Sequence, residues 1–328
     1  MGDDYVLKDT TGKVKLENLK INENPRFITY LYPGFGYGVY DRNNLPGIPQ
    51  LLLYLVESRS SGLYNIKDKN GKGFLDWFDV VKDGTSFVGA AEIEMSRGLY
   101  ERSLRSSNLE VKVSLGQVGR TSLVVASQLF SPGESTPVVS QVYREVLIDS
   151  ASRKPAVIPT WFRERFEGKG TLENVPFVVE KFERPTRTFM QSFTISWLDT
   201  DANGHTNFTI YPRFAINALH HALFLKSKSL GDRHNKGDET SFQISESLQK
   251  SWHGDLSAVD GMSEEIVKCG LKNFKINFIN ECKQGDTVLT HIWTPDKGKF
   301  LIKCSIEKPD GTRLCQIVLE YFGPSSRL

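Results

Sequence analysis

Apolar residues recur along this chain at strand-like and helix-like spacings, and the same order of elements occurs twice. In the first half, residues 25–32 read as a strand and residues 33–44 as a glycine-rich turn. Residues 46–63 then have helical periodicity, with apolar side chains at Ile48, Leu51, Leu52, Tyr54 and Leu55. Four strand patterns follow, at residues 85–95, 109–115, 121–130 and 138–148.

The second half repeats this order. Residues 187–197 read as a strand, residues 198–207 as a loop and residues 208–230 as a long helix. Four more strands are expected, at residues 266–280, 286–294, 299–307 and 314–322. A strand, one long helix and an antiparallel run of strands can bury their apolar faces by wrapping the sheet around the helix. The pattern therefore predicts an α+β protein built from two similar domains.

The domain boundaries follow from the segments between these patterns. We expect an arm at residues 1–24, a first domain at 25–149, a connector at 150–185, a second domain at 186–323 and a tail at 324–328. The second domain contains a polar segment, residues 226–264, that has no counterpart in the first. Two interpretations stay open for this segment, a surface loop and a lid over a substrate channel.

Composition excludes several kinds of partner. The chain has 328 residues and a formal net charge of +2, which gives no electrostatic basis for binding nucleic acid. Its longest apolar run, residues 51–56, is far shorter than a membrane span. The 4 cysteines lack the spacing of a zinc site, and no secretory leader is visible. We therefore expect a reduced, intracellular protein that holds no metal.

The last three residues point to one compartment. Ser326-Arg327-Leu328 is a conservative variant of the Ser-Lys-Leu terminus that the peroxisomal import receptor reads. The alternative is a solvated polar terminus without a role. The sequence favours peroxisomal import over a cytoplasmic location.

The loop before the second helix concentrates the chemistry of the chain. It carries Asp199, Asp201, Asn203, His205 and Asn207 directly before the predicted helix at 208–230. Unpaired N–H groups at a helix start can hold an oxyanion, and a carboxylate with an imidazole supplies acid–base chemistry. Asp and Asn before a helix are also ordinary caps, which is how we interpret Asp199. Four polar side chains at alternate positions, from 201 to 207, exceed what one cap requires.

The string from Asp201 to Asn207, DANGHTN, resembles the D-x-N-x-H-x-N signature of hot-dog-fold thioesterases, closest to the acyl-ACP thioesterases. A second match is Glu281-Cys282, which resembles the Glu-Cys pair on a strand of that family. The resemblance implies two fused hot-dog units, each an antiparallel sheet wrapped around a long central helix. It also implies a catalytic set and a substrate-binding set in the second unit, which are Asp201, Asn203, His205 and Glu281 for catalysis and Asn207, Phe208 and Tyr211 for substrate binding.

The resemblance implies an acyl thioesterase that releases a free acid and a thiol without a cofactor. Because the possible peroxisomal terminus suits acyl-CoA, we expect acyl-CoA rather than an acyl carrier protein thioester as substrate. The first unit is expected to be non-catalytic, since its turn holds Asp41 and Asn43 but no histidine. Either Asp201 or Glu281 can be the base or nucleophile, and either a monomer or a homodimer is feasible. The alternatives are a non-catalytic acyl-thioester-binding protein and a hot-dog dehydratase or hydratase.

Overall fold

The computed structural model describes residues 5–7, 17–68, 71–82, 84–101, 104, 107–173, 177–231, 252–295 and 300–324. The chain divides into two compact units, Met1–Val179 and Glu180–Leu328. Each unit contains a run of antiparallel strands and buried apolar residues, and each is described by itself. Ser326-Arg327-Leu328 lies outside the described residues. No helix in the part of the chain that the structure describes is long and apolar enough to cross a membrane.

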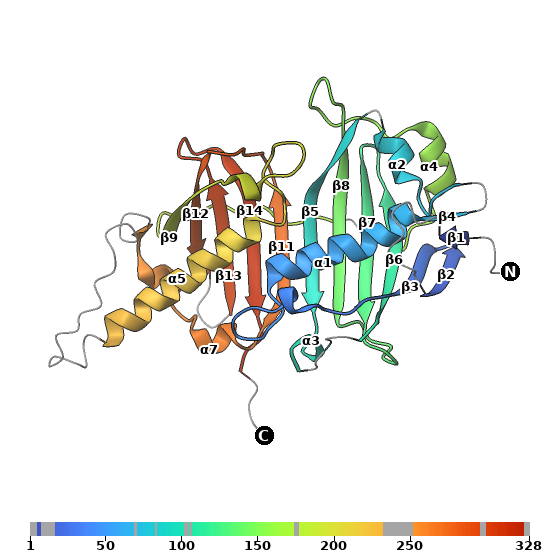
Figure 1. Ribbon diagram of the computed structural model, residues 1–328. Helices are drawn as coiled ribbons and strands as arrows, with labels where there is room; N and C mark the ends of the chain where they lie inside the picture. Colours follow the sequence, from blue (N-terminus) through green and yellow to red (C-terminus); the bar gives the residue numbers. More distant parts are fainter. Residues whose placement is uncertain are drawn as a thin grey trace. The chain divides into compact units, whose positions relative to one another are not determined.

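Unit 1 is an antiparallel sheet with the strand order β5-β8-β7-β6-β3-β2 (Figure 1). Its strands are β2 (Glu17–Glu23), β3 (Arg26–Tyr32), β5 (Thr85–Met95), β6 (Leu109–Val118), β7 (Ser122–Phe130) and β8 (Val139–Ile148). A separate two-stranded sheet joins β1 (Tyr5–Leu7) to β4 (Ile66–Asp68). The helical elements are η1 (Tyr37–Val39), α1 (Ile48–Ser60), η2 (Ser61–Asn65), α2 (Trp77–Val81), α3 (Gly98–Glu101) and α4 (Thr160–Phe166).

Helix α1 lies across the face of the unit 1 sheet (Figure 1). Leu51, Leu52 and Leu55 are fully or almost fully buried, as their helical spacing predicts. The helix starts at Ile48, with Pro49 in the first turn, where proline costs no hydrogen bond. The α-helix ends at Ser60, and the remaining residues of the expected helix, up to 63, continue in the wider π-helical turn η2.

Unit 2 is an antiparallel sheet with the strand order β10-β9-β12-β13-β14-β11. Its strands are β9 (Phe189–Thr194), β10 (Trp252–Gly254), β11 (Leu271–Phe278), β12 (Thr287–Trp293), β13 (Leu301–Glu307) and β14 (Arg313–Tyr321). The helical elements are η3 (Trp197–Asp199), α5 (Tyr211–Gly231), η4 (Leu256–Val259) and α7 (Glu264–Val267).

Helix α5 lies across the strands of unit 2 and contacts β9, β12 and β14 (Figure 1). Ala215, Ala218 and Ala222 are completely buried and recur every three or four residues along one side of the helix. Small side chains at these positions let the helix backbone approach the sheet closely. Phe214 adds a stacked contact with Phe193 of β9, at 4.9 Å between ring centroids. This packing fixes the start of α5, and therefore the loop before it, against the sheet.

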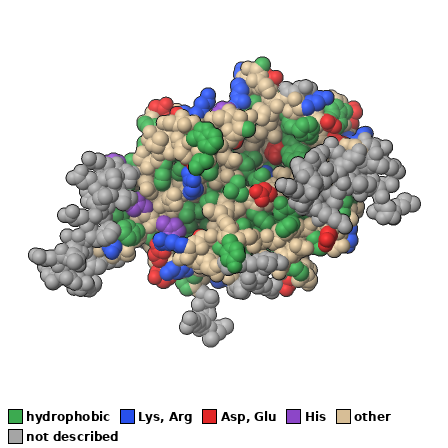
Figure 2. All heavy atoms as spheres, viewed as in Figure 1, with side chains coloured by type: hydrophobic (Ala, Val, Ile, Leu, Met, Phe, Trp, Pro, Cys, Tyr) green, Lys and Arg blue, Asp and Glu red, His purple; other side chains and the backbone are tan. Residues whose placement is uncertain are grey.

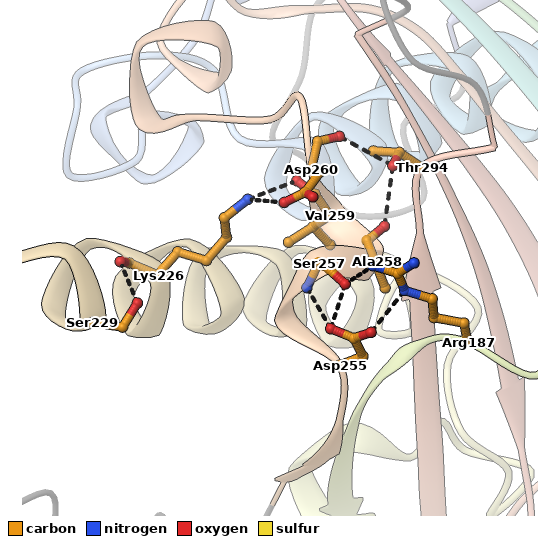
Figure 3. A network of polar contacts seen from close by, with 9 residues as sticks. All are labelled: Arg187, Lys226, Ser229, Asp255, Ser257, Ala258, Val259, Asp260 and Thr294. Atoms are coloured by element: carbon orange, nitrogen blue, oxygen red, sulfur yellow. Dashed lines mark hydrogen bonds and ion pairs between the residues drawn. The ribbon is translucent and has the colours of Figure 1, made fainter.

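The polar segment at 226–264 is partly regular structure. Residues 226–231 continue α5, residues 232–251 lie outside the described residues, and residues 252–254 form β10, which pairs with β9. A polar network then holds the η4 segment (Figure 3): Lys226 binds Asp260 at 2.8 Å, and the Thr294 hydroxyl donates to the Ala258 carbonyl at 3.1 Å. The described end of the segment is therefore anchored to α5 and to the residue after β12. The strand expected at 266–280 also differs, because α7 occupies 264–267 and β11 starts at Leu271.

Candidate active site

The loop between β9 and α5 folds back on itself at residues 200–206. The Asp201 backbone N–H donates to the His205 carbonyl at 2.8 Å, and Thr200 pairs with Thr206 as an isolated β-bridge. Gly204, with φ at +72°, takes the left-handed conformation that this reversal requires. The result is a short closed turn that presents residues 201–205 directly before α5.

Asp201 stabilises this turn through its side chain. Its Oδ1 accepts the backbone N–H groups of Asn203, at 2.8 Å, and of His205, at 3.3 Å. Both bonds satisfy backbone donors that would otherwise depend on water. Asp201 is half-buried and Asn203 is exposed. The Asp201 carboxylate therefore has a structural task in addition to any chemical one.

The same turn occurs in unit 1. Asp41 Oδ1 accepts the backbone N–H groups two and four residues later, at 2.8 and 3.0 Å, as Asp201 does in unit 2. The Asp41 backbone N–H also donates to the Leu45 carbonyl at 2.7 Å, which matches the bond from Asp201 to His205. Leu45 thus stands at the position of His205. An identical backbone arrangement in unit 1 carries no imidazole, so the imidazole is specific to unit 2.

Asp199 is a capping residue, but of the short η3 rather than of the long helix that follows the loop. Its Oδ2 accepts the backbone N–H of Ser196 at 2.8 Å and the Ser196 hydroxyl at 2.7 Å, which forms the capping box of η3. Its Oδ1 binds the guanidinium of Arg213 on α5. Burial acts to raise the pKa of Asp199, but the bonds from Ser196 and Arg213 outweigh it and hold that pKa below its usual value. Asp199 is therefore a buried anion that ties η3 to α5.

The residues after β11 form the opposite side of the site. Cys282 is completely buried, and its carbonyl accepts the backbone N–H of Thr206 at 2.9 Å. Its Sγ lies 3.1 Å from the Thr206 hydroxyl and 3.2 Å from the Tyr211 hydroxyl. Burial raises the pKa of the Cys282 thiol, so this sulfur is a protonated packing group rather than a nucleophile.

His205 and Glu281 meet across this junction. The His205 Nε2 lies 3.4 Å from the Glu281 Oε2, and the two side chains are 15% and 42% exposed. Residues 205 and 283 also form an isolated antiparallel bridge, which aligns the two segments. The resemblance implied that Glu281 lies on a strand, but this is not observed. Strand β11 ends at Phe278, and the chain turns there toward β12. The turn leaves the carboxylate accessible to solvent and to the imidazole.

The three residues expected to bind substrate lie at the start of α5. Asn207 Oδ1 accepts the Thr209 backbone N–H at 3.0 Å and the Thr209 hydroxyl at 2.9 Å, so Asn207 caps the turn that leads into the helix. The Phe208 and Tyr211 rings contact Phe278 edge-on, at 6.1 and 5.6 Å between centroids. Phe208 is half-buried and Tyr211 is buried, so this end of the helix is apolar below the polar loop.

Sequence reasoning missed the contribution of Thr206. Its hydroxyl donates to the Cys282 carbonyl at 3.2 Å in addition to the contact with Cys282 Sγ, and the side chain is buried. The sequence did contain a signal for this role. Thr206 is a small, β-branched polar residue between His205 and Asn207, and such a side chain is suited to a buried hydrogen bond between two segments. The structure brings His205 next to Glu281 through this bridge.

The arrangement is suited to acid–base chemistry on a polar group bound near the start of α5. A carboxylate and an imidazole stand within 3.4 Å of each other in front of α5. The helix start offers few free donors, because the backbone N–H groups of Thr209, Ile210 and Arg213 are already bonded and Pro212 has none. Among the described residues, no group of three or more His, Cys, Asp or Glu side chains is arranged to hold a metal ion. Lys and Arg side chains are interspersed with Asp and Glu on the face shown in Figure 2, without a large patch of one sign.

Comparison with known proteins identifies the fold. No protein-family model and no curated protein matches the chain. Among solved structures, the 12:0-ACP thioesterase from Umbellularia californica is similar, with a TM-score of 0.56, 15% identity, and 90% of this chain and 97% of that chain covered. An acyl-ACP thioesterase from Bacteroides thetaiotaomicron gives a TM-score of 0.55 and 14% identity over 90% of this chain and 98% of that chain. The chain therefore has the fold of acyl thioesterases, and its antiparallel sheets with few helices fit the hot-dog fold.

Proposed function

We propose that this protein hydrolyses acyl thioesters, and that His205 and Glu281 carry the reaction. The observation on which the proposal depends is the 3.4 Å separation of His205 Nε2 and Glu281 Oε2 in a chain with the fold of acyl thioesterases. The fold alone does not assign chemistry, since one fold hosts many functions. The chemistry is assigned to the pair of His205 and Glu281. The matching turn of unit 1 has Leu45 in place of the histidine, so the turn alone does not require an imidazole.

In the proposed reaction a water molecule attacks the thioester carbonyl carbon. The Glu281 and His205 pair accepts a proton from that water as the new C–O bond forms. Negative charge develops on the carbonyl oxygen, and the exposed Asn203 side-chain amide is proposed to donate to it. The C–S bond then breaks, and the thiolate takes up the proton, which gives a free acid and a thiol. A thiol of pKa about 8.5 is a good leaving group, so little acid assistance is needed.

Asp201 and Asn203 complete the proposed catalytic set. The Asp201 Oδ1 is occupied by backbone donors, so its proposed role is to supply negative charge beside His205 while it holds the turn. The exposed Asn203 amide is available to donate to the carbonyl or to position water. Asn207, Phe208 and Tyr211 are proposed to receive the substrate where the polar loop meets the apolar start of α5.

The repeated turn supports a chain of two fused hot-dog units, each with a sheet wrapped around its helix. Asp41 and Asp201 make matching backbone contacts, and each turn leads into the main helix of its unit. We propose that the first unit is non-catalytic, because it lacks the imidazole. The proposed domain boundaries are those of the sequence analysis, with the connector at 150–185.

The experiment is to measure thiol release from a panel of acyl-CoA and acyl carrier protein thioesters of increasing chain length. Wild-type protein is compared with Glu281→Gln, which keeps the size of the side chain, and with His205→Asn, which removes the imidazole but keeps a polar side chain. We expect turnover in the wild type and a loss of at least 100-fold in kcat in each variant. The two carriers are assayed together, so that the proposed preference for coenzyme A over acyl carrier protein is measured directly. No release of thiol from any substrate by folded protein would refute the proposal.

A further inference from the structure

Lys283 stands directly opposite His205, where the two segments of the candidate site meet. The two residues form an isolated antiparallel bridge, and the bond from the Thr206 N–H to the Cys282 carbonyl lies next to it. Side chains directly opposite each other in such a pair project to the same side, with their Cβ atoms about 5 Å apart. The Lys283 side chain therefore leaves the backbone beside the imidazole.

The burial of the neighbouring residues shows which side this is. Glu281 and Lys283 are exposed and Cys282 between them is completely buried, as in an extended segment whose side chains alternate. Cys282 and Thr206 face the core, where Sγ and the hydroxyl are in contact. His205 contacts Glu281 and so lies on the solvent side. The imidazole, the carboxylate and the ammonium group thus project from one side of the junction.

The turn that follows fixes the backbone of Lys283. The Lys283 N–H donates to Asp286 Oδ2 at 3.0 Å, and its carbonyl accepts the Asp286 N–H at 3.1 Å. The Gly285 N–H donates to the Ile195 carbonyl at 2.9 Å, which ties this turn to the residue after β9. The base of the Lys283 side chain is therefore held in place, while its flexible stem lets the ammonium group reach a bound substrate.

Two acidic side chains close to this junction already have cationic partners. The Lys308 ammonium lies 2.9 Å from Asp286 Oδ2, and this contact is the main cause that holds the pKa of Asp286 below its usual value, with a smaller contribution from the charge of Lys283. In the preceding loop, Asp199 binds the guanidinium of Arg213. Neither carboxylate therefore depends on Lys283 as its principal counter-charge.

The hydrolysis proposed above benefits from a positive charge on this side of the junction. Asp201 and Glu281 are both carboxylates, and the attack of water places further negative charge on the carbonyl oxygen. Negative charges close together repel each other. The Asn203 amide is a neutral donor, and hydrogen bonds from a charged donor are roughly twice as strong. Of the side chains on this side of the bridge, Lys283 is the one that carries such a donor.

We propose that Lys283 is a further catalytic residue, whose ammonium group donates a hydrogen bond to the thioester carbonyl oxygen as that oxygen becomes negative. This role depends on the proposed hydrolysis. As the water oxygen bonds to the carbonyl carbon, the π electron pair moves onto the carbonyl oxygen, and it returns when the C–S bond breaks. The proton of the water passes to the pair of His205 and Glu281 and then to the thiolate. Lys283 keeps its own proton throughout.

The position of Lys283 favours this role over binding of the carrier. In coenzyme A and in acyl carrier proteins, the phosphate groups are separated from the sulfur by the pantetheine arm. A cation that starts beside the imidazole is close to the reacting carbonyl group, whereas the phosphates lie at the far end of that arm. A substrate without phosphates therefore separates the two roles.

The test uses two thioesters that share one acyl group, the one that the wild type hydrolyses fastest. One is the coenzyme A thioester, and the other is the N-acetylcysteamine thioester, which has no phosphate. We expect Lys283→Met to lower kcat at least tenfold on both, with KM changed less than twofold. Lys283→Arg keeps a charged donor and should recover at least a third of the wild-type kcat. Lys272→Met removes the same charge near the start of β11, where Lys272 binds Glu320, and should leave both constants unchanged.

Three results would overturn this role of Lys283. A raised KM for the coenzyme A thioester alone would show that Lys283 binds the phosphates of the carrier. Wild-type constants in Lys283→Met would show that the ammonium group takes no part in the reaction. A melting temperature of Lys283→Met well below that of the wild type would assign it a structural task, whereas we expect no change because the side chain is exposed. An inactive wild-type protein would instead refute the hydrolysis itself, and the role of Lys283 with it.

Discussion

The Thr206 backbone N–H donates to the Cys282 carbonyl at 2.9 Å, and the Thr206 hydroxyl lies 3.1 Å from Cys282 Sγ. His205 and Glu281 each directly precede one member of this pair in the chain. The contact between Thr206 and Cys282 therefore aligns the two segments and brings the imidazole and the carboxylate to 3.4 Å. The geometry of the candidate site depends on a neutral, buried bridge that takes no part in the proposed chemistry.

This dependence predicts the effect of Thr206→Val. The variant keeps the β-branched shape and the backbone bond but loses the hydroxyl bonds to Cys282. We expect a loss of about 1–2 kcal/mol in unfolding free energy, measured by denaturant titration. We also expect kcat to fall at least fivefold with little change in KM, because the alignment of His205 with Glu281 loosens. Thr206→Ser keeps the hydroxyl and should retain most of the activity. Wild-type kinetics in Thr206→Val would contradict this account.

Much of the fold could be predicted from the sequence because the signals are local. The alternation along β8 and the helical spacing of Leu51, Leu52 and Leu55 reflect which side of each element is buried, and both elements form where expected. The end of α1 was not predicted, although Gly62 lies two residues beyond Ser60 in the π-helical turn, where a Cβ would lie 2.8 Å from the Tyr30 ring.

The candidate site was only partly accessible from the sequence. The turn at Asp201 follows from short-range hydrogen bonds, so its motif carried the information. Glu281 is 76 positions from His205, and the contacts of Thr206 with Cys282 and of His205 with Lys283 bring the two segments together.

A double-mutant cycle tests whether His205 and Glu281 act as one unit. If the pair handles a single proton, His205→Asn and Glu281→Gln should each remove nearly all of the activity, and the double variant should be no worse than either. Stability should change by less than about 1 kcal/mol in each, because Glu281 is 42% exposed and exposed ion pairs contribute little. Multiplicative losses in kcat/KM would show that the two side chains act independently.

Asp201→Asn separates the structural task of this residue from its proposed charge. Asparagine keeps an Oδ1 that can accept the two backbone N–H groups, so the turn and the melting temperature should be preserved. If the negative charge contributes to catalysis, kcat should fall more than tenfold. Asp41→Asn is the matched control, because it makes the same change in the equivalent turn of unit 1 and should leave kcat unaltered. Full activity in Asp201→Asn would restrict Asp201 to holding the loop.

The half-buried imidazole of His291 predicts a loss of stability in mild acid. Burial, reinforced by the Arg184 guanidinium, lowers the pKa of His291 to about 4, and its Nδ1 lies 3.0 Å from the Thr188 hydroxyl. An unfolded histidine has a pKa of about 6.5, so between pH 6.5 and 4 the unfolded chain takes up a proton that the folded chain does not. Acidification over this window therefore favours unfolding.

The expected contribution of His291 is roughly 1–3 kcal/mol, lost as the pH falls from 6.5 to 4. His291→Gln cannot titrate, so its unfolding free energy should depend less steeply on pH across that window than that of the wild type. Chemical denaturation at half-unit steps of pH measures both slopes, and comparing them removes the contributions of the carboxylates that both proteins share. His253→Gln, at an exposed position on β10, should retain the wild-type slope. Parallel curves for wild type and His291→Gln would show that His291 does not bind the extra proton on unfolding.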